Sequence, residues 1–348
     1  MSRTISYAEA VREATDQCLE ADPRVLVMGL GVPDPKGVFG TTSGLAERHG
    51  DERVSDLPTS ENGMTGVALG CAIAGMRPIM THIRTEFAML AIDQIVNQAA
   101  KWRYMFGGRM SAPLVIRLLV GRGWGQGPQH SQSLQAWFAH IPGLKVVMPV
   151  TPRDAKGLLI ASVEDDDPVI FIEHRWLHGV TGDVAEEMYS TAIGEARTAH
   201  DGDDVTIAAT SYMVLEAIRA AETLESVGVG AHVLDLRSVR PWDRRAVLES
   251  AARTGRLIVA DTGWATAGFA AEVVAHVAEE GVRLTAPPRR IALPDVPTPT
   301  SPALAADFYP RAREIVAAAA AQLGIEAPAL PESDLPLDVP DPVYAGPF

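Results

Sequence analysis

The stretch on which the fold prediction depends runs Thr59-Ser60-Glu61-Asn62-Gly63-Met64-Thr65-Gly66-Val67-Ala68-Leu69-Gly70-Cys71-Ala72-Ile73-Ala74-Gly75. It follows a short strand-like segment at 53–57, which Pro58 closes. Thr59 or Ser60 is placed to cap a helix by accepting hydrogen bonds from its free N–H groups, and the run after Glu61 is apolar but built of small residues. The sequence therefore predicts a single carboxylate at the N-terminal end of a closely packed helix.

The Glu61 carboxylate has two interpretations. In the first, it is an ordinary acidic residue of a first helical turn, stabilised by the helix dipole. In the second, it lies in a half-buried cleft and exchanges a proton with a ligand. The stretch by itself leaves both open, and the rest of the chain has to decide between them.

Short apolar segments alternate with helix-like segments along most of the 348 residues. The segments predicted as strands, for example 113–120 and 169–172, are near-continuous apolar runs, which is typical of a parallel sheet covered by helices on both faces. Two such α/β units are separated by a charged, turn-rich stretch. We predict a first domain over 1–178, a linker over 179–203, a second domain over 204–324 and an extended tail, rich in Pro and Asp, over 325–348.

Composition narrows the class of protein. The chain is 47% hydrophobic and 21% charged, and its formal net charge of −14 argues against a nucleic-acid partner, because phosphate binding needs clustered Lys and Arg. The apolar run at 63–75 is too short and too rich in glycine to span a membrane, and no signal peptide is evident. Cys18 and Cys71 have no motif spacing and are predicted as buried free thiols. We expect a soluble cytoplasmic protein without a membrane partner.

A second informative stretch is the glycine-rich loop Gly121-Arg122-Gly123-Trp124-Gly125-Gln126-Gly127-Pro128-Gln129-His130-Ser131. It follows a predicted core strand, where ligand sites of open parallel sheets lie. Its glycines do not match a known phosphate-binding loop, and a flexible surface turn is the alternative. His130, at the end of the loop, is the histidine best placed for acid–base chemistry or for stabilising an anion. Phe87 follows another strand end and could stack on a ring.

Other polar groups have more ordinary interpretations. His140, His174 and His178 fit capping or packing roles, and no pair of histidines shows metal-ligand spacing such as His-x-x-x-His with a third partner nearby. The acidic run at 164–167 fits a solvated loop before a strand, although backbone carbonyls there could hold a monovalent cation.

Several stretches occur in the order that one family shows. They are Asp56-Leu57-Pro58-Thr59-Ser60-Glu61-Asn62-Gly63, Asp93-Gln94-Ile95, His130-Ser131-Gln132-Ser133, Pro142-Gly143-Leu144-Lys145-Val146-Val147-Met148-Pro149, Asp154-Ala155-Lys156-Gly157-Leu158-Leu159 and Asp235-Leu236-Arg237 with Pro241 and Asp243. Together they resemble the β subunit of the thiamine-diphosphate-dependent 2-oxoacid dehydrogenase decarboxylase component (pyruvate, branched-chain and acetoin types). The resemblance covers residues 4 to about 323. It implies a transketolase-like pyrimidine-binding domain followed by a transketolase C-terminal-like domain.

The resemblance assigns roles to individual residues. It implies that Glu61 binds the pyrimidine N1′ of thiamine diphosphate and activates the cofactor, because a carboxylic acid at N1′ favours the imino form that removes the thiazolium proton. A packed, water-poor cleft would suit that exchange. Phe87 matches an aromatic residue beside the pyrimidine, and His130 matches a histidine near the substrate. The family can also hold K⁺ on backbone carbonyls, here those of Leu114, Ser162, Asp165 and Asp167.

The resemblance also implies partners. The superfamily holds Mg²⁺ and the diphosphate with Gly-Asp-Gly followed by Asn-Asn, and this chain has no Gly-Asp-Gly. A separate α subunit would therefore hold them, in an assembly of two α and two β chains, with the small-residue helix after Glu61 as a contact face. The implied reaction is decarboxylation of a 2-oxo acid and transfer of the acyl group to a lipoyl domain of an acyltransferase. A two-subunit transketolase- or acyloin-type carboligase is the alternative; a scaffold without catalysis is a third, which the presence of Glu61 and His130 argues against.

Three departures from the family pattern leave the substrate and the acyl acceptor open. Gly29-Leu30-Gly31-Val32 stands where the family usually has Gly-Glu-Asp-Val. Arg84-Thr85-Glu86-Phe87 stands where it often has Phe-Ala-Asp-Phe. Trp124 and Gln126 also lie in the loop before His130.

Overall fold

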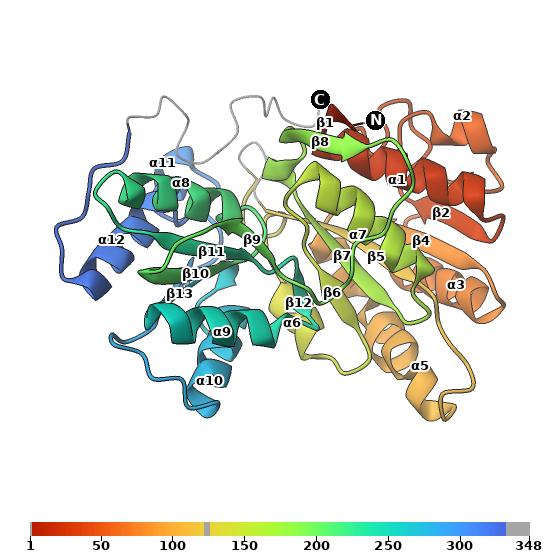
Figure 1. Cartoon of the computed structure of the whole chain (residues 1–348). Coiled ribbons are helices and arrows are strands. Elements are labelled where there is room, and N and C mark those ends of the chain that lie inside the picture. The colour runs from red at the N-terminus through yellow and green to blue at the C-terminus, as the bar shows by residue number, and fades with distance from the viewer. Residues whose placement is uncertain (1, 122–125, 332–348) are drawn as a thin grey trace. The chain divides into compact units, whose positions relative to one another are not determined.

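The computed structural model describes residues 2–121 and 126–331 (Figure 1). Trp124 and the part of the predicted tail from 332 onward lie outside the described residues. The chain forms two compact units, one of residues 2–121 and 129–193 and one of residues 126–128 and 194–331. The stretch that the sequence analysis assigns to a linker carries two strands, β8 (Thr181–Ala185) in the first unit and β9 (Arg197–His200) in the second.

The first unit is built on a parallel sheet. Its strands lie in the order β6-β7-β5-β4-β2-β3, and each neighbouring pair is parallel. The strands are β2 (Val25–Gly29), β3 (Val54–Ser55), β4 (Arg77–His82), β5 (Val115–Val120), β6 (Lys145–Val147) and β7 (Val169–His174). Every residue of β5 and of β7 is buried, which explains why both read as unbroken apolar runs. A separate antiparallel pair joins β1 (Ser2–Ser6) to β8.

Helices cover both faces of this sheet. Figure 1 shows α1 (Tyr7–Ala21) and α7 (Pro152–Glu164), which pack together, on one face, and α3 (Glu61–Ile73) and α5 (Ala100–Met105) on the other. The capping box predicted at the start of α1 is present, with Ser6 and Glu9 bonded reciprocally. The remaining helical segments are α2 (Leu45–His49), α4 (Thr85–Ala88), η1 (Met89–Ala91), η2 (Asp93–Ala99), α6 (Gln135–His140) and η3 (Arg175–Leu177).

One predicted helix is irregular. The helical spacing from Met89 to Tyr104 is realised as the 3₁₀ turn η1, the π-helical segment η2 and then α5. Both η1 and η2 pack against α3, the helix that begins at Glu61. A π-helical turn is uncommon and often lies beside a functional site.

The second unit repeats the same architecture. Its sheet has the order β14-β13-β10-β11-β9, in which all neighbours are parallel except the antiparallel edge strand β9. Its strands are β9, β10 (Val205–Ala209), β11 (Ala231–Asp235), β13 (Leu257–Trp264) and β14 (Arg289–Leu293), and β12 (Ser238–Arg240) also belongs to this part of the chain. Its helices are α8 (Met213–Glu225), α9 (Arg244–Thr254), α10 (Phe269–Glu279), α11 (Pro302–Ala305) and α12 (Ala312–Leu323). The predicted class, two α/β domains with mainly parallel sheets, is confirmed.

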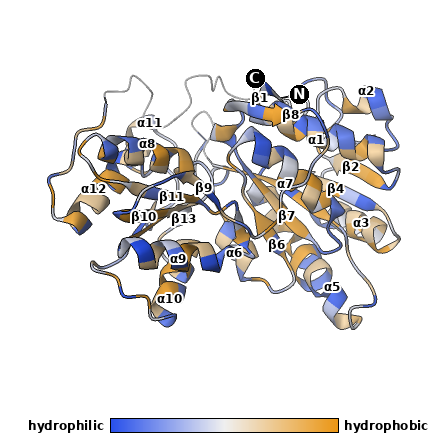
Figure 2. Ribbon diagram, viewed as in Figure 1, coloured by the Kyte–Doolittle hydropathy of each residue, from blue (hydrophilic) through white to orange (hydrophobic). Residues whose placement is uncertain are grey.

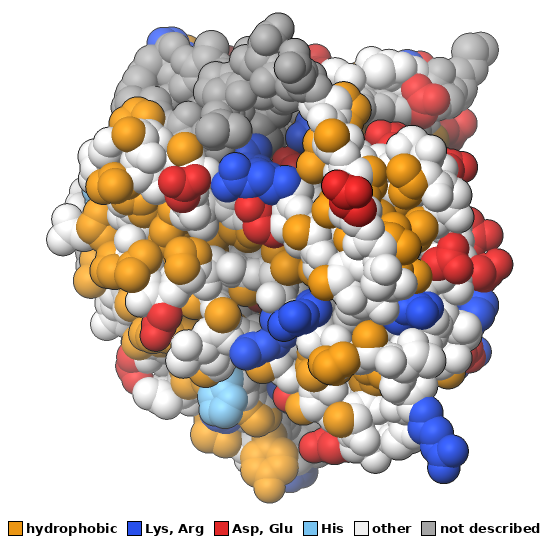
Figure 3. Space-filling model, turned by 90° about the vertical axis from the view of Figure 1, so that its left-hand side faces the viewer, with side chains coloured by type: hydrophobic (Ala, Val, Ile, Leu, Met, Phe, Trp, Pro, Cys, Tyr) orange, Lys and Arg blue, Asp and Glu red, His pale blue; other side chains and the backbone are white. Residues whose placement is uncertain are grey.

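Side-chain polarity follows this layering. Figure 2 shows hydrophobic strands beneath helices whose outer sides are hydrophilic. On the face drawn in Figure 3, basic side chains are interspersed with acidic ones rather than gathered in one stripe. Cys18 is buried as predicted, whereas Cys71 is only half-buried because α3 leaves part of its surface exposed, including Val67 at 49%. Within the described residues, no helix is long and apolar enough to cross a membrane.

Candidate active site

A pocket opens at the carboxyl edge of the first sheet. The neighbouring parallel strands β2 and β4 meet there, and the chain leaves them toward opposite sides, from β2 to β3 and from β4 to β5. Such a switch point leaves a crevice outside the strand ends, where ligands of open α/β sheets bind. The pocket is lined by residues that follow or end β2, β3 and β4 and by the first turns of α3 and α4: Leu30, Leu57, Pro58, Thr59, Glu61, Met64, Met80, Thr81, His82, Ile83 and Phe87.

Glu61 is the first residue of α3, and its side chain is half-buried in the pocket wall. From the described residues, no hydrogen bond or ion pair reaches its carboxylate. The predicted cap is wrong: Ser60 stands at the N-cap position, but its side chain accepts no bond from the helix. The backbone of Ser60 has φ −155° and ψ 72°. Its hydroxyl lies against Gly63, since a Cβ added to Gly63 would be 2.9 Å from Ser60 Oγ. Among the described residues, the Glu61 carboxylate thus has no partner and no side chain caps the start of α3.

Two loops are held close together beside Glu61. At the end of β2, a Cβ on Gly29 would lie 2.4 Å from the carbonyl oxygen of Thr81, so only glycine allows the two strands to approach this closely. Asp56 ties the following loops together, since its Oδ1 accepts hydrogen bonds from the N–H of Gly31 at 2.9 Å and of Leu57 at 2.8 Å. Leu30 is thereby placed in the pocket wall, where the family pattern carries an acid, and this part of the wall is apolar.

Phe87 and His130 lie side by side. Phe87 lines the pocket, and its ring contacts that of His130 edge-on, with centroids 5.7 Å apart. The guanidinium of Arg84 lies 5.8 Å from the Phe87 ring centroid, within cation–π range. Nδ1 of His130 is buried and has no hydrogen-bond partner among the described residues. The structure thus places His130 beside the pocket that Glu61 and Phe87 share.

Sequence reasoning missed the part played by Glu86. Its Oε1 accepts a hydrogen bond of 2.6 Å from the backbone N–H of Gln132, two residues beyond His130. Burial raises the pKa of Glu86, although this hydrogen bond and the charges of Arg175 and His130 act in the opposite direction. Glu86 therefore fastens the segment that carries His130 to α4. The available signal was the retained acid in Arg84-Thr85-Glu86-Phe87.

His82 was also missed. It ends β4, is buried and lines the pocket, with Nε2 3.2 Å from Thr65 Oγ1 on α3. Burial lowers the pKa of His82 to about 4, so the ring is neutral at neutral pH. Its place at a strand end beside the switch point was the only sequence signal. The ordinary interpretation of His174 is confirmed, because its Nδ1 accepts a hydrogen bond from the N–H of Trp176 at 3.2 Å.

Comparisons with known proteins identify the family. Two family models match, "Transketolase, pyrimidine binding domain" over residues 3–179 and "Transketolase, C-terminal domain" over residues 194–315. The β subunit of acetoin:2,6-dichlorophenolindophenol oxidoreductase from Cupriavidus necator is 44% identical and aligns over 92% of this chain and 97% of its own length. The β subunit of the mitochondrial pyruvate dehydrogenase E1 component from Caenorhabditis elegans is 42% identical, with 92% and 93% covered. The chain belongs to the family of thiamine-diphosphate-dependent 2-oxoacid dehydrogenase β subunits.

Further relatives agree with this assignment. The 2-oxoisovalerate dehydrogenase β subunit of Bacillus subtilis is 41% identical and aligns over 90% of this β subunit and 97% of its own length. A solved split-gene transketolase, described as an inactive β4 tetramer, superimposes with a TM-score of 0.77 at 25% identity and covers 92% of this chain and 99% of its own. The family resemblance inferred from the sequence motifs is confirmed.

The pocket of this β subunit fits one half of the family's cofactor. Its walls are largely apolar, with one carboxylate, Glu61, and two rings, those of Phe87 and His82, which suits a flat heteroaromatic ring that exchanges a proton. No Lys or Arg is among the lining residues, so the pocket offers no basic side chain to a diphosphate. Among the described residues, no group of three or more His, Cys, Asp or Glu side chains is placed to hold a metal ion.

Proposed function

We propose that this chain is the β subunit of a two-subunit enzyme that decarboxylates a 2-oxo acid and passes the acyl group to the lipoyl domain of an acyltransferase. The observation that carries the proposal is the Glu61 carboxylate, which faces an apolar pocket at the switch point of the sheet without a partner among the described residues. The names of the relatives, which act on acetoin, pyruvate or 2-oxoisovalerate, favour a dehydrogenase over the carboligase alternative. Their diversity leaves the identity of the substrate to experiment.

Each of the main residues in and beside the pocket would have a separate role. When bound, thiamine diphosphate supplies the nucleophilic carbon of the reaction. Glu61 would hold and move a proton at the pyrimidine N1′, and the apolar walls exclude water and so strengthen that contact. Phe87 would pack against the pyrimidine. His130, whose ring contacts Phe87, would donate a proton to the substrate or stabilise negative charge on it.

A separate α subunit would complete the site. The pocket lining offers a diphosphate no basic side chain and the chain has no Gly-Asp-Gly to hold Mg²⁺, so both would be held by groups from another chain. A set of large apolar side chains exposed on α3, η1 and the end of α5 supports such a partner, since exposed apolar surface is available for burial in a protein interface. It comprises Val67 at 49% exposure, Leu90 at 63%, Tyr104 at 89%, Met105 at 54% and Phe106 at 40%. We propose an assembly of two α and two β chains.

The test is turnover by the co-purified α and β chains with 2,6-dichlorophenolindophenol as electron acceptor. Pyruvate, 2-oxoisovalerate and acetoin are offered to the wild type and to Glu61→Gln, which keeps the side-chain shape but cannot exchange the proton. Glu47→Gln is the matched control, because Glu47 also lies in the first turn of a helix of the same unit. We expect Glu61→Gln to lower kcat about 10²- to 10⁴-fold and Glu47→Gln to leave it unchanged.

Two outcomes would change the proposal. If the Glu61→Gln variant turns over substrate at the same rate as the wild type, Glu61 does not have the role proposed for it. Acceptor reduction that is absent with every substrate, together with product formed only when an aldehyde is added, would identify a carboligase.

A further inference from the structure

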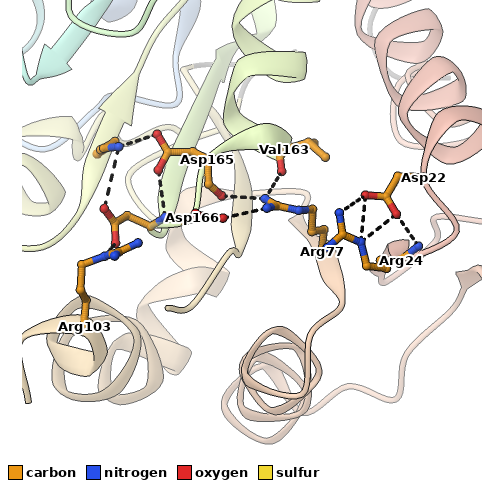
Figure 4. A network of polar contacts seen from close by, with 9 residues as sticks. Asp22, Arg24, Arg77, Arg103, Val163, Asp165 and Asp166 are labelled. Carbon is orange, nitrogen blue, oxygen red and sulfur yellow. Dashed lines mark hydrogen bonds and ion pairs between the residues drawn. The ribbon is translucent and has the colours of Figure 1, made fainter. Parts of the chain in front are cut away.

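The turn between α7 and β7 lies at the amino edge of the first sheet, where the family resemblance implies a K⁺ ion on the carbonyls of Leu114, Ser162, Asp165 and Asp167. In this chain an arginine reaches the turn. Arg77, the first residue of β4, donates from Nη1 to the carbonyl oxygens of Val163 at 2.8 Å and of Asp165 at 3.0 Å (Figure 4). Its Nη2 donates to Oδ1 of Asp166 at 2.7 Å. One of the four expected K⁺ ligands, the Asp165 carbonyl, is thus already bound to a cation.

Positive charge is favourable at the carboxyl end of α7. The last carbonyls of α7 have no partner within the helix and carry the negative end of its dipole. Val163 and Asp165 lie at this end, and the Arg77 side chain that binds them is only 16% exposed. A guanidinium offers several N–H groups in one plane, so a single side chain satisfies two carbonyls and a carboxylate together. Arg77 therefore does for this helix end what a bound cation would do.

The surrounding charges leave no place for a second cation. Lys145 binds the carboxylate of Asp165 and lies 4.0 Å from that of Asp167, which Arg103 also binds. Asp165 Oδ1 additionally accepts the N–H of Asp167 at 2.9 Å. The three carboxylates of the turn are each paired with a basic side chain, so they bring no unpaired negative charge to attract a K⁺ ion to the expected position.

A second expected ligand is engaged in the sheet. The carbonyl oxygen of Leu114 accepts the N–H of Val169 at 3.0 Å, at the start of the β5–β7 pairing. The residues present do not fit a K⁺ site. We propose that the guanidinium of Arg77 holds the place of the monovalent cation at this turn, and that the folded state of this β subunit does not depend on K⁺.

Thermal unfolding of the full-length chain, with any partner chain that co-purifies, tests the proposal independently of turnover and of Glu61. Tm is measured in KCl, NaCl and choline chloride at equal ionic strength for the wild type, Arg77→Gln and Arg53→Gln. Arg53 is a matched control, because it also donates to backbone carbonyls of the same unit, those of Val25 and Asp22, each at 2.8 Å, but touches no carboxylate of the turn.

We expect the wild type to have the same Tm in all three salts. Arg77→Gln should lose about 4 to 8 °C in choline chloride, and KCl should restore part of that loss. Arg53→Gln should be destabilised equally in every salt. A wild-type Tm that is higher in KCl than in NaCl and choline chloride would overturn the proposal, as would an Arg77→Gln variant that responds to the salts no differently from Arg53→Gln. If Arg77→Gln does not fold, Arg77→Lys, which keeps the charge, takes its place, and the wild-type comparison still decides.

Discussion

Arg117 on β5 and Glu173 on β7 form an ion pair whose two side chains are both 0% exposed. Arg117 Nε donates to Glu173 Oε1 at 2.7 Å and Nη2 donates to Thr41 Oγ1 at 2.8 Å, while Nη1 has no partner among the described residues. Glu173→Gln would leave this guanidinium buried without its counter-charge. Breaking a buried pair in this way costs about 3 to 5 kcal/mol, which corresponds to a fall in Tm of about 6 to 20 °C for a domain of this size.

The assay is a double-mutant cycle by chemical and thermal unfolding, with Glu173→Leu, Arg117→Met and the double variant Arg117→Met/Glu173→Leu, and Glu173→Gln is measured beside it. Replacing both partners by apolar side chains of similar volume removes both desolvation costs, so the double variant should be more stable than either single one. A loss below about 1 kcal/mol for Glu173→Gln would refute the reasoning. So would a double variant whose loss equals the sum of the two single losses.

The same pair predicts a pH dependence. Burial by itself would favour the neutral form of Glu173, but the positive charges of Arg117 and His178 hold the pKa of Glu173 below its usual value. A carboxyl whose pKa is lowered by folding stabilises the folded state above its unfolded pKa of about 4.3, and this stabilisation disappears as the pH falls through the lower folded value. The difference in stability between the wild type and Glu173→Gln should therefore shrink below about pH 4.

Two further predictions concern the active-site segment. Glu86→Gln replaces a charge-assisted hydrogen bond from the N–H of Gln132 by a neutral one. We expect kcat to fall up to about tenfold while the affinity for thiamine diphosphate stays unchanged. Steady-state kinetics measures kcat and a cofactor titration measures the affinity, and an equal change in both would contradict the positioning role of Glu86. Gly121→Ala should destabilise by more than about 1 kcal/mol, because φ is +87° and a Cβ would lie 2.3 Å from His174 Nε2. Gly40→Ala, where φ is +81° and no atom lies within 4 Å of the added Cβ, is the control for backbone strain alone, and equal losses of Tm in the two variants would show that the contact with His174 has no effect.

The sequence predicted the parallel sheets because their central strands are buried on both faces. In β5 and β7, polar and apolar residues do not alternate, so each strand is visible in the sequence as one apolar run. The ends of these runs agree with the ends of the strands in the structure to within a few residues. The edge strands gave no such signal. β8 and β9 are half-exposed and polar, and they pair antiparallel with strands far along the chain, so their position is set by tertiary contacts alone.

The candidate site likewise contains residues that the sequence could indicate and residues that it could not. Glu61, Phe87 and His130 could be found because each stands just after a strand or at the end of a glycine loop, where parallel sheets place their ligands. The roles of Glu86 and Arg77 could not, because their partners lie 46 and 88 residues away and the contact exists only after folding. The Ser60 cap failed for the opposite reason: the local motif was present, but in the folded chain the Ser60 side chain accepts no hydrogen bond from the helix N–H groups.

The two edges of the first sheet treat charge differently, and the difference locates the chemistry. At the amino edge, the carboxylates of Asp165, Asp166 and Asp167 are each paired with a basic side chain, so nothing remains for a ligand to satisfy. At the carboxyl edge, Glu61 has apolar neighbours and no partner among the described residues. We therefore assign the proposed proton exchange to Glu61 rather than to the acidic turn, because its carboxylate, unlike those of the turn, is available to a ligand that enters the pocket.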